Sequence, residues 1–323
     1  MIFKSSNLLL LISVSLVPLS LISGSFFPDF LTSLSALLIL CIIIYKNLFH
    51  YLINKYSILF FFYCIYIISL SLFSENIILS FESTLFYFRF GFFSIAVLYL
   101  LETNKKFILF FSFSIFAAFL ILVCDTLSAL IFENSFFGNR YNGKYYTSVF
   151  GEEKIMGSYI SRLFPLMIFI LYYLRKNMFI KKYYNFLNIL IIILSLVLVF
   201  VSNERAAILI LLSNIFLYSI FRFDKYLYGF ILIFIFAIIA FVTFSKEYRD
   251  FLLRGIYEPS TIEINSLTEY QNIIKNIDFP SDYFMIYSTS FKIFQDNYIF
   301  GIGPKNFRIK CTDKKYWFNE SAK

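Results

Sequence analysis

Residues 186–221 read FLNILIIILSLVLVFVSNERAAILILLSNIFLYSIF, and this stretch decides the fold class. Its only charged residues lie in the polar tetrad Ser202-Asn203-Glu204-Arg205, and the rest is largely apolar. As one helix, its 36 residues would extend roughly 54 Å, far beyond the roughly 30 Å hydrocarbon core of a bilayer. The stretch therefore predicts two short membrane-spanning helices joined by a polar hairpin tip.

The composition of the whole chain also indicates a membrane protein. The 323 residues are 60% hydrophobic, 22% aromatic and 15% charged, with a mean hydropathy of +0.77. Soluble domains are nearer half apolar and a quarter charged, so this chain has too little polar surface to cover a soluble core. We expect an all-α, polytopic integral membrane protein with about nine transmembrane helices. The expected spans are residues 7–24, 31–45, 57–74, 84–101, 107–132, 155–174, 186–201, 206–221 and 226–244.

We expect two parts along the chain. Residues 1–244 are expected to form a transmembrane helical domain, and residues 245–323 a water-exposed C-terminal segment. Helices are expected in this segment around residues 245–256 and 283–297. The second is indicated by apolar residues at a spacing near 3.6, namely Phe284, Tyr287, Phe291 and Phe294.

The basic residues indicate the orientation. With the N-terminus inside, the inner segments carry 11 Lys or Arg, whereas the outer loops before residue 245 carry four. The positive-inside rule therefore predicts a cytoplasmic N-terminus, and an odd number of spans then puts the C-terminal segment outside. We interpret the net charge of +8 as a topology signal, and expect a lipid bilayer rather than a nucleic acid as the partner.

The first polar feature is the expected outer loop over residues 133–156. It contains Phe-Gly-Asn-Arg-Tyr-Asn-Gly-Lys at residues 137–144 and Gly151-Glu152-Glu153 further on. Gly and Asn favour tight turns, and Arg140 and Lys144 are cations at the outer face. An ordinary polar loop is the alternative interpretation.

The second feature is Arg205 at the hairpin tip. A charged group at such depth is costly unless it is paired or faces a wet cavity. The alternatives are an arginine that snorkels to the interface, or one that its neighbour Glu204 neutralises.

The third feature is Gly301-Ile302-Gly303-Pro304-Lys305-Asn306-Phe307-Arg308. A Gly-x-Gly-Pro segment predicts a sharp, rigid turn, whose backbone N–H groups are able to bind an anion. A purely structural turn fits the same pattern.

Other ionisable residues lie outside these three features, among them Arg162 inside an expected span. Arg89 and Asp125 fall inside expected spans, and a pair between them would neutralise both at that depth. The single histidine, His50, cannot build a zinc site, and we expect no metal.

Taken together, the three polar features resemble the O-antigen ligase and O-antigen polymerase family of bacterial membrane glycosyltransferases. The similarity covers residues 130–310, and the Gly-x-Gly-Pro-x-Asn-Phe motif is its most specific part. The matching stretches are Asn139-Arg140 through Gly143, Glu152 through Gly157-Ser158-Tyr159, Leu163-Phe164-Pro165, Ser202-Asn203-Glu204-Arg205-Ala206-Ala207, and Phe291-Lys292-Ile293-Phe294 through Phe300 to Phe307.

The resemblance implies transfer of a glycan from an undecaprenyl-diphosphate carrier, at the periplasmic face of the inner membrane and without metal. Ligases of this family use a lipid A–core acceptor, and polymerases use a second carrier-linked glycan. No cofactor is expected, because the donor supplies its own leaving group. Both the ligase and the polymerase alternatives stay open.

The resemblance also implies roles for single residues. Arg205 matches a family arginine that contacts the diphosphate, and a guanidinium suits phosphate because it offers a fork of donors. The resemblance gives no base among these residues, because the single histidine, His50, is expected on the inner side; Glu152 is our candidate general base, with Glu153 as the alternative. The candidate substrate-binding residues are Arg140, Lys144, Gly301, Gly303, Asn306 and Arg308. We expect Arg205, Arg140 and the turn at residues 301–308 to face one outer cavity, because a diphosphate needs several converging donors.

The sequence departs from the family pattern in two places. The family continues past the glycine motif into a His-Pro-His-Asn segment and further spans, whereas this sequence ends at Lys323. Tyr283 stands where the family has an upstream arginine. We therefore expect a C-terminally truncated member of the family, in which residues 245–323 are a periplasmic segment, an incomplete large periplasmic loop.

Two other classes of function remain as alternatives. A secondary transporter or lipid-linked glycan flippase would favour repeated halves and ionisable groups near the midplane; here the charges gather at the outer face. A membrane anchor that displays residues 245–323 to a protein would leave Arg205 and the Arg140 loop unexplained.

Overall fold

The computed structural model describes residues 2–132, 136–137, 145–151, 153–175, 178–222 and 280–316. Every regular element in these residues is helical, as the composition predicts. The α-helices are α1 (Ile2–Ser20), α2 (Phe26–Lys46), α3 (Lys55–Leu72), α4 (Ile77–Thr84), α5 (Phe88–Thr103), α6 (Phe107–Phe132), α7 (Met156–Leu174), α8 (Met178–Ser202), α9 (Arg205–Arg222), α13 (Pro280–Asp296) and α14 (Phe307–Lys310). Short 3-10 turns are Leu21–Ser23, Phe49–Tyr51, Ser148–Phe150 and Lys314–Tyr316.

Seven segments of the described chain are long and apolar enough to cross a membrane, and they correspond to the first seven expected spans. The protein is thus a polytopic membrane protein. The fourth segment, Ile77–Thr103, comprises both α4 and α5. The eighth expected span corresponds to α9, whose apolar part, Arg205–Ile220, is shorter. The ninth, residues 226–244, lies outside the described residues, as do the 244/245 domain boundary and the helix expected at 245–256.

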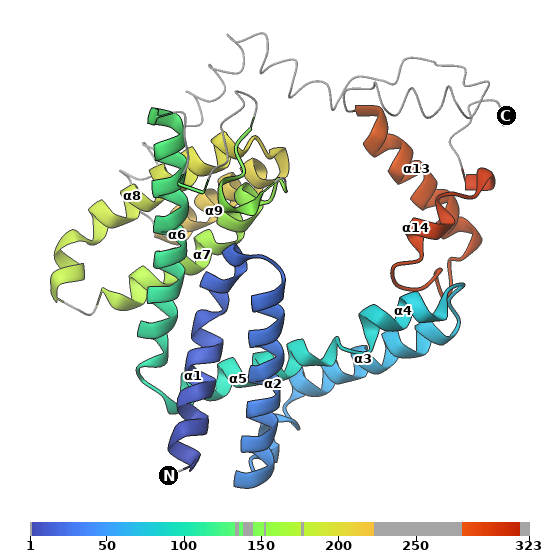
Figure 1. Cartoon of the computed structure of the whole chain (residues 1–323), viewed down its shortest axis with the longest axis horizontal. Coiled ribbons are helices and arrows are strands. Elements are labelled where there is room, and N and C mark those ends of the chain that lie inside the picture. Colours follow the sequence, from blue (N-terminus) through green and yellow to red (C-terminus); the bar gives the residue numbers. More distant parts are fainter. Residues whose placement is uncertain are drawn as a thin grey trace. The chain divides into compact units, whose positions relative to one another are not determined.

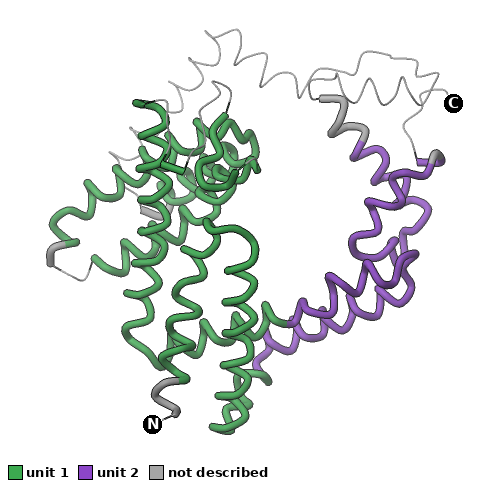
Figure 2. The backbone as a smooth tube through the Cα atoms, viewed as in Figure 1, with its two compact units in different colours: residues 1–53, 89–234 green, residues 54–88, 235–323 purple. Residues whose placement is uncertain are grey.

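The chain divides into two compact units, shown in Figure 2. Unit 1 comprises residues 1–53 and 89–234, and its described part is a helical bundle. In it α1 packs against α2 and α6, and α7 packs against α6, α8 and α9 (Figure 1). The core contains the fully buried side chains of Leu10, Ile39, Ile115, Leu122 and Phe164.

A polar cluster joins three helix ends at one end of the unit 1 bundle. Lys46, at the end of α2, donates to the hydroxyl of Tyr99 in α5 (2.9 Å), and that hydroxyl donates to Asn7 in α1 (3.3 Å). Nearby, the hydroxyl of Tyr51 donates to the carboxylate of Glu102. Burial and this hydrogen bond raise the pKa of Tyr51 to about 12. The start of α1 and the ends of α2 and α5 therefore lie on the same side.

The prediction that Arg89 pairs with Asp125 is wrong. Arg89 in α5 instead forms an ion pair with Asp29, in the first turn of α2, with 2.8 Å between Nη2 and Oδ1. A carboxylate in the first turn of a helix also suits the positive end of the helix dipole. This pair explains why α2 begins at Phe26, before the expected start at residue 31: the charge that interrupted the apolar run is neutralised.

Unit 2 comprises residues 54–88 and 235–323. Here α3 and α4 pack together. Each is preceded by an asparagine whose side chain accepts a hydrogen bond from a backbone N–H of the first turn. Asn54 accepts from Tyr56, and Asn76 accepts from Leu79 at 3.0 Å. Such caps satisfy donors that have no partner within the helix. Helix α13 includes residues 283–296 and so confirms the helix expected at 283–297.

Candidate functional site

The polar tetrad forms the turn that the sequence predicts. Helix α8 ends at Ser202 and α9 begins at Arg205. Asn203, between them, has φ +55°, in the left-handed region that asparagine tolerates better than most residues. Arg205 is half-buried and opens α9, where the helix dipole presents its positive end.

Glu204 fixes this turn to the N-terminus of α7. Its carboxylate accepts from the backbone N–H of Gly157 (2.6 Å), the N–H of Ser158 (3.1 Å) and the Ser158 hydroxyl (2.6 Å). The first N–H groups of a helix have no intrahelical acceptor and carry partial positive charge. Glu204 therefore caps a helix whose Gly157 lies 47 residues earlier in the chain.

Gly157 is needed for this close approach. A Cβ at this position would lie 2.3 Å from Ser202 Oγ, 3.0 Å from Glu204 Oε1 and 3.1 Å from the Cβ of Ala207. Any side chain would push α7 away from the turn and lengthen the hydrogen bonds to Glu204. Two of the stretches that carry the family resemblance are thus in direct contact.

Asp125 holds the chain on both sides of residues 138–144. This fully buried carboxylate in α6 accepts from the Tyr146 hydroxyl (2.5 Å), the Ser148 hydroxyl (2.6 Å) and the backbone N–H of Phe136 (3.0 Å). Phe136 precedes these residues and Tyr146 follows them. A buried charge is tolerated where hydrogen bonds satisfy it, and here three donors do so.

The same segment is attached to the end of α8. The backbone N–H of Tyr146 donates to the carbonyl of Val201 at 3.0 Å, directly before the polar turn. Lys154 lies over the ring of Tyr145, with 3.8 Å from Nζ to the ring centroid. Tyr146, on the flank that follows the loop, therefore lies beside the turn that contains Arg205. Arg140, Lys144 and Glu152 themselves lie outside the described residues.

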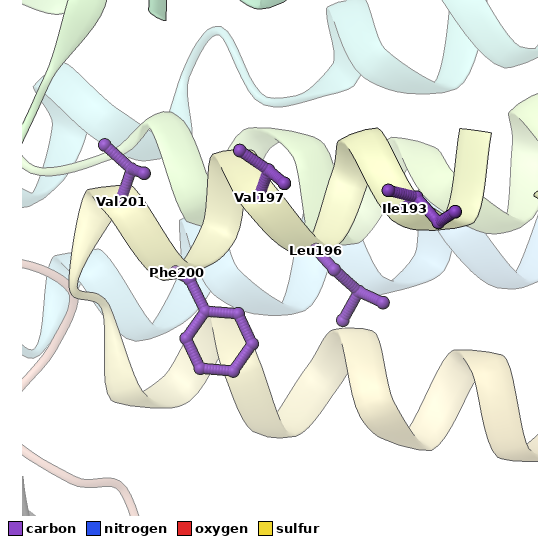
Figure 3. A pocket seen from close by; sticks show the side chains of 5 residues that line it. All are labelled: Ile193, Leu196, Val197, Phe200 and Val201. Carbon is purple, nitrogen blue, oxygen red and sulfur yellow. The ribbon is translucent and has the colours of Figure 1, made fainter. Parts of the chain in front are cut away.

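An apolar hollow of about 300 Å³ lies along α8 next to the turn. Figure 3 shows its lining side chains, with Leu196 and Phe200 on the same side of the helix. All five come from α8 at helical spacing, and the last directly precedes the polar turn: Ile193, Leu196, Val197, Phe200 and Val201. The volume is at the lower end of the range for small-molecule sites, roughly 300–1,000 Å³.

The Gly-x-Gly-Pro segment forms the predicted turn, in unit 2. Gly301 and Gly303 have φ +67° and +84°, which favour glycine. A Cβ at Gly303 would lie 2.4 Å from the Cβ of Ser74, whereas Gly301 has open space around it. Gly303 is therefore required both by its backbone and by its contact with the chain after α3.

Asn306 and Arg308 differ in their surroundings. Asn306 is fully buried, and its amide donates to Ser80 Oγ at 2.8 Å; Ser80 in turn donates to the carbonyl of Pro304 at 3.0 Å. Arg308 is exposed. Asn306 thus holds the turn in place. Arg205 lies in unit 1 and this turn in unit 2, so the expected shared cavity stays a prediction.

Sequence reasoning missed the two carboxylates that organise the site. Glu204 was considered only as a neighbour of Arg205, and Asp125 only as a partner of Arg89. A capping carboxylate usually lies close in sequence to its helix, so no local pattern identifies Glu204. Within the described ranges, no three His, Cys, Asp or Glu side chains lie close enough to hold a metal. Comparisons with known protein families, curated proteins and solved structures find no match.

Proposed function

We propose that this chain is a bacterial membrane glycosyltransferase of the O-antigen ligase kind, which moves a glycan from an undecaprenyl-diphosphate carrier to a lipid-linked acceptor. One observation carries the proposal. Glu204, on the turn that contains Arg205, accepts three hydrogen bonds from the start of α7. Residues from two of the resembling stretches, 47 positions apart, therefore belong to one polar site.

The charges around this site suit a diphosphate. Arg205 combines a guanidinium with the positive end of α9, and both favour an anion. Tyr146, which follows the loop containing Arg140 and Lys144 in the sequence, is held beside the Arg205 turn through Asp125 and Val201. Arg205 binds the phosphates through its fork of donors, and the loop cations add to the positive field.

The apolar hollow on α8 suits the other end of such a donor. Its lining is aliphatic and aromatic, and it reaches Val201 beside the polar turn. An isoprenoid carrier has an apolar chain directly attached to its diphosphate. Its binding site therefore requires an apolar surface directly beside a positively charged one. The hollow accommodates only the part of the carrier next to the phosphates.

The proposed reaction is a displacement at the anomeric carbon. The acceptor hydroxyl forms the new C–O bond, and the bond from the anomeric carbon to the diphosphate breaks. Undecaprenyl diphosphate leaves with the bonding electrons, and Arg205 stabilises the added charge on it. The proton of the acceptor hydroxyl goes to a carboxylate, for which Glu152 is the candidate. Arg308 is a candidate for binding the glycan or the phosphates.

The distribution of Lys and Arg supports one orientation for this activity. The cluster of Lys46, Tyr99 and Asn7 lies at the end of the bundle where the first, second and fifth helices meet. The inner segments of the topology, which include Lys46, carry most of the basic residues before residue 245. In the proposal that end faces the cytoplasm, and the Arg205 turn faces the periplasm.

The proposal is tested with the full chain in proteoliposomes that contain a synthetic undecaprenyl-diphosphate-linked glycan. Arg205→Gln should reduce transfer on the order of 10²–10³-fold, as expected when a donor to the developing charge is removed. Arg205→Lys should restore part of it, because a point charge replaces a fork. Binding of undecaprenyl diphosphate to the purified chain is the second readout and should weaken in the same order.

Arg175→Gln is the matched control. Arg175 directly follows α7, at the opposite end of that helix from Glu204, and its guanidinium lies 4.6 Å from the Tyr172 ring centroid. Both readouts should be unchanged. Unchanged carrier binding in Arg205→Gln would refute the proposed site. Supplying a lipid A–core acceptor in one arm and a second carrier-linked glycan in another separates a ligase from a polymerase.

A further inference from the structure

An aromatic stripe runs along the exposed side of α13. Tyr287, Phe291 and Phe294 recur four and three residues apart, which places them within one narrow sector of the helix. Tyr298, two residues after the helix ends, continues the stripe, and the exposed fractions of the four side chains are 68%, 59%, 58% and 68%. Ile299 and Phe300 extend the exposed apolar surface into the following turn. Contiguous apolar surface of this kind marks an interaction site.

The opposite side of α13 is already occupied within unit 2. Ile293 and Thr289 are buried, and the Thr289 hydroxyl donates to the carbonyl of Tyr316 at 3.1 Å. Lys315, beside Tyr316, forms an ion pair with Asp296 at 2.6 Å, which raises the pKa of Lys315. The helix thus has one side covered by its own chain and a separate aromatic side that is exposed.

The segment after α13 is held at the end of a membrane-spanning helix. The ring of Phe300 stacks on that of Phe73, the residue directly after α3, with 6.0 Å between centroids. Gly303 lies against Ser74, and Lys310 donates to Glu75. The exposed aromatic surface therefore reaches, at Phe300, the depth at which α3 ends.

Helix α3 itself requires lipid around it. It is a candidate span, and in the described structure only Cys64, Ile67 and Ser71 of its side chains are buried. Tyr56, Leu59, Phe62, Tyr63, Ile65 and Tyr66 are among its exposed side chains. A helix that exposes apolar side chains on most of its surface is solvated by hydrocarbon. The end of α3 therefore marks a boundary between hydrocarbon and water.

Composition and charge both fit the lipid–water boundary. Tyrosine and other aromatic residues favour this region, because one end of the ring system is apolar and the other polar. Residues 280–316 contain six Lys or Arg and three Asp, so the segment is also attracted to anionic headgroups. A surface that binds another protein would not require this combination of aromatic side chains and excess positive charge.

We propose that α13 and the turn after it form an interfacial membrane anchor, with the Tyr287–Phe291–Phe294–Tyr298 stripe inserted among the lipid headgroups. The anchor fixes the Gly301–Asn306 turn at the membrane surface, beyond the end of α3. This inference is independent of the glycosyltransferase proposal, since it rests only on unit 2.

The test uses tryptophan as a depth probe in the full chain. The sequence contains one Trp, so Trp317→Phe gives a background without tryptophan. In this background, Phe294→Trp places the probe on the stripe. Gln295→Trp places it on the neighbouring polar side and is the matched control. Phe62→Trp in α3 is the deep reference. Each variant is reconstituted in vesicles of phosphatidylethanolamine and phosphatidylglycerol, and emission is quenched by brominated lipids or by aqueous acrylamide.

Phe294→Trp should be quenched best by lipids brominated near the headgroup, at a depth of about 5–10 Å. Its emission should be blue-shifted relative to Gln295→Trp, which acrylamide should quench instead. Quenching of both by acrylamide to the same extent would overturn the proposal. Protection of Phe294→Trp from both quenchers would also overturn it, in favour of a protein covering. If that variant does not fold, Tyr298→Trp on the same stripe serves as the probe.

Discussion

Replacing Glu204 by glutamine tests how the turn before α9 is held. The glutamine keeps one acceptor oxygen for the N–H of Gly157, but its NH₂ group faces the N–H of Ser158 and leaves that donor unpaired. An unpaired buried donor costs about 1–3 kcal/mol, and the lost interaction of the charge with the α7 dipole costs about 0.3–1 kcal/mol more. We therefore expect Glu204→Gln to lower the free energy of unfolding by roughly 1–4 kcal/mol.

The measurement is reversible unfolding in mixed micelles of dodecyl maltoside and SDS, followed by circular dichroism. Glu153→Gln is the matched control, because Glu153 is exposed and directly precedes Lys154 near the same helix start. Its effect should stay within about 0.5 kcal/mol. Ser158→Ala should cost about 1 kcal/mol by itself, and less in the Glu204→Gln background, because the two groups share one interaction. Equal stabilities for Glu204→Gln and Glu153→Gln would refute the capping role.

Two further predictions concern other parts of the molecule. Gly303→Ala should destabilise unit 2 by roughly 2–5 kcal/mol, from backbone strain and the clash with Ser74, whereas Gly301→Ala should cost only the strain, about 1–2 kcal/mol; equal losses in unfolding free energy would contradict the clash. Tyr51→Phe should cost about 2 kcal/mol at neutral pH through the lost hydrogen bond to Glu102. The folded-state pKa of Tyr51 is raised to about 12, so its contribution should be complete below the unfolded-state pKa and disappear as pH rises through about 12; a difference from Tyr51→Phe that does not change with pH would contradict this assignment.

Hydropathy predicted the helices well because a membrane span depends on length and apolar content, which are both local properties. The start of α2 was the exception. Asp29 interrupts the apolar run in the sequence, but Arg89 neutralises it from another helix. No feature near Asp29 in the sequence reveals a partner 60 residues away.

The candidate site was only partly predictable for the same reason. The hairpin tip and the glycine turn follow from local chemistry, since polar residues break an apolar run and Gly-x-Gly-Pro restricts the backbone. The attachment of Glu204 to α7, and of Asp125 to Tyr146, depends on how helices pack. Such pairings have no periodicity in the sequence, and only the assembled bundle brings them together.

The double attachment at Asp125 has a consequence for the variability of the protein. Because Phe136 and Tyr146 both donate to this one carboxylate, the chain between them starts and finishes at a fixed point of α6. The entropic cost of closing such a segment rises only with the logarithm of its length. Insertions or replacements between these two attachment points should therefore leave the packing of α9, the helix that carries Arg205, unchanged.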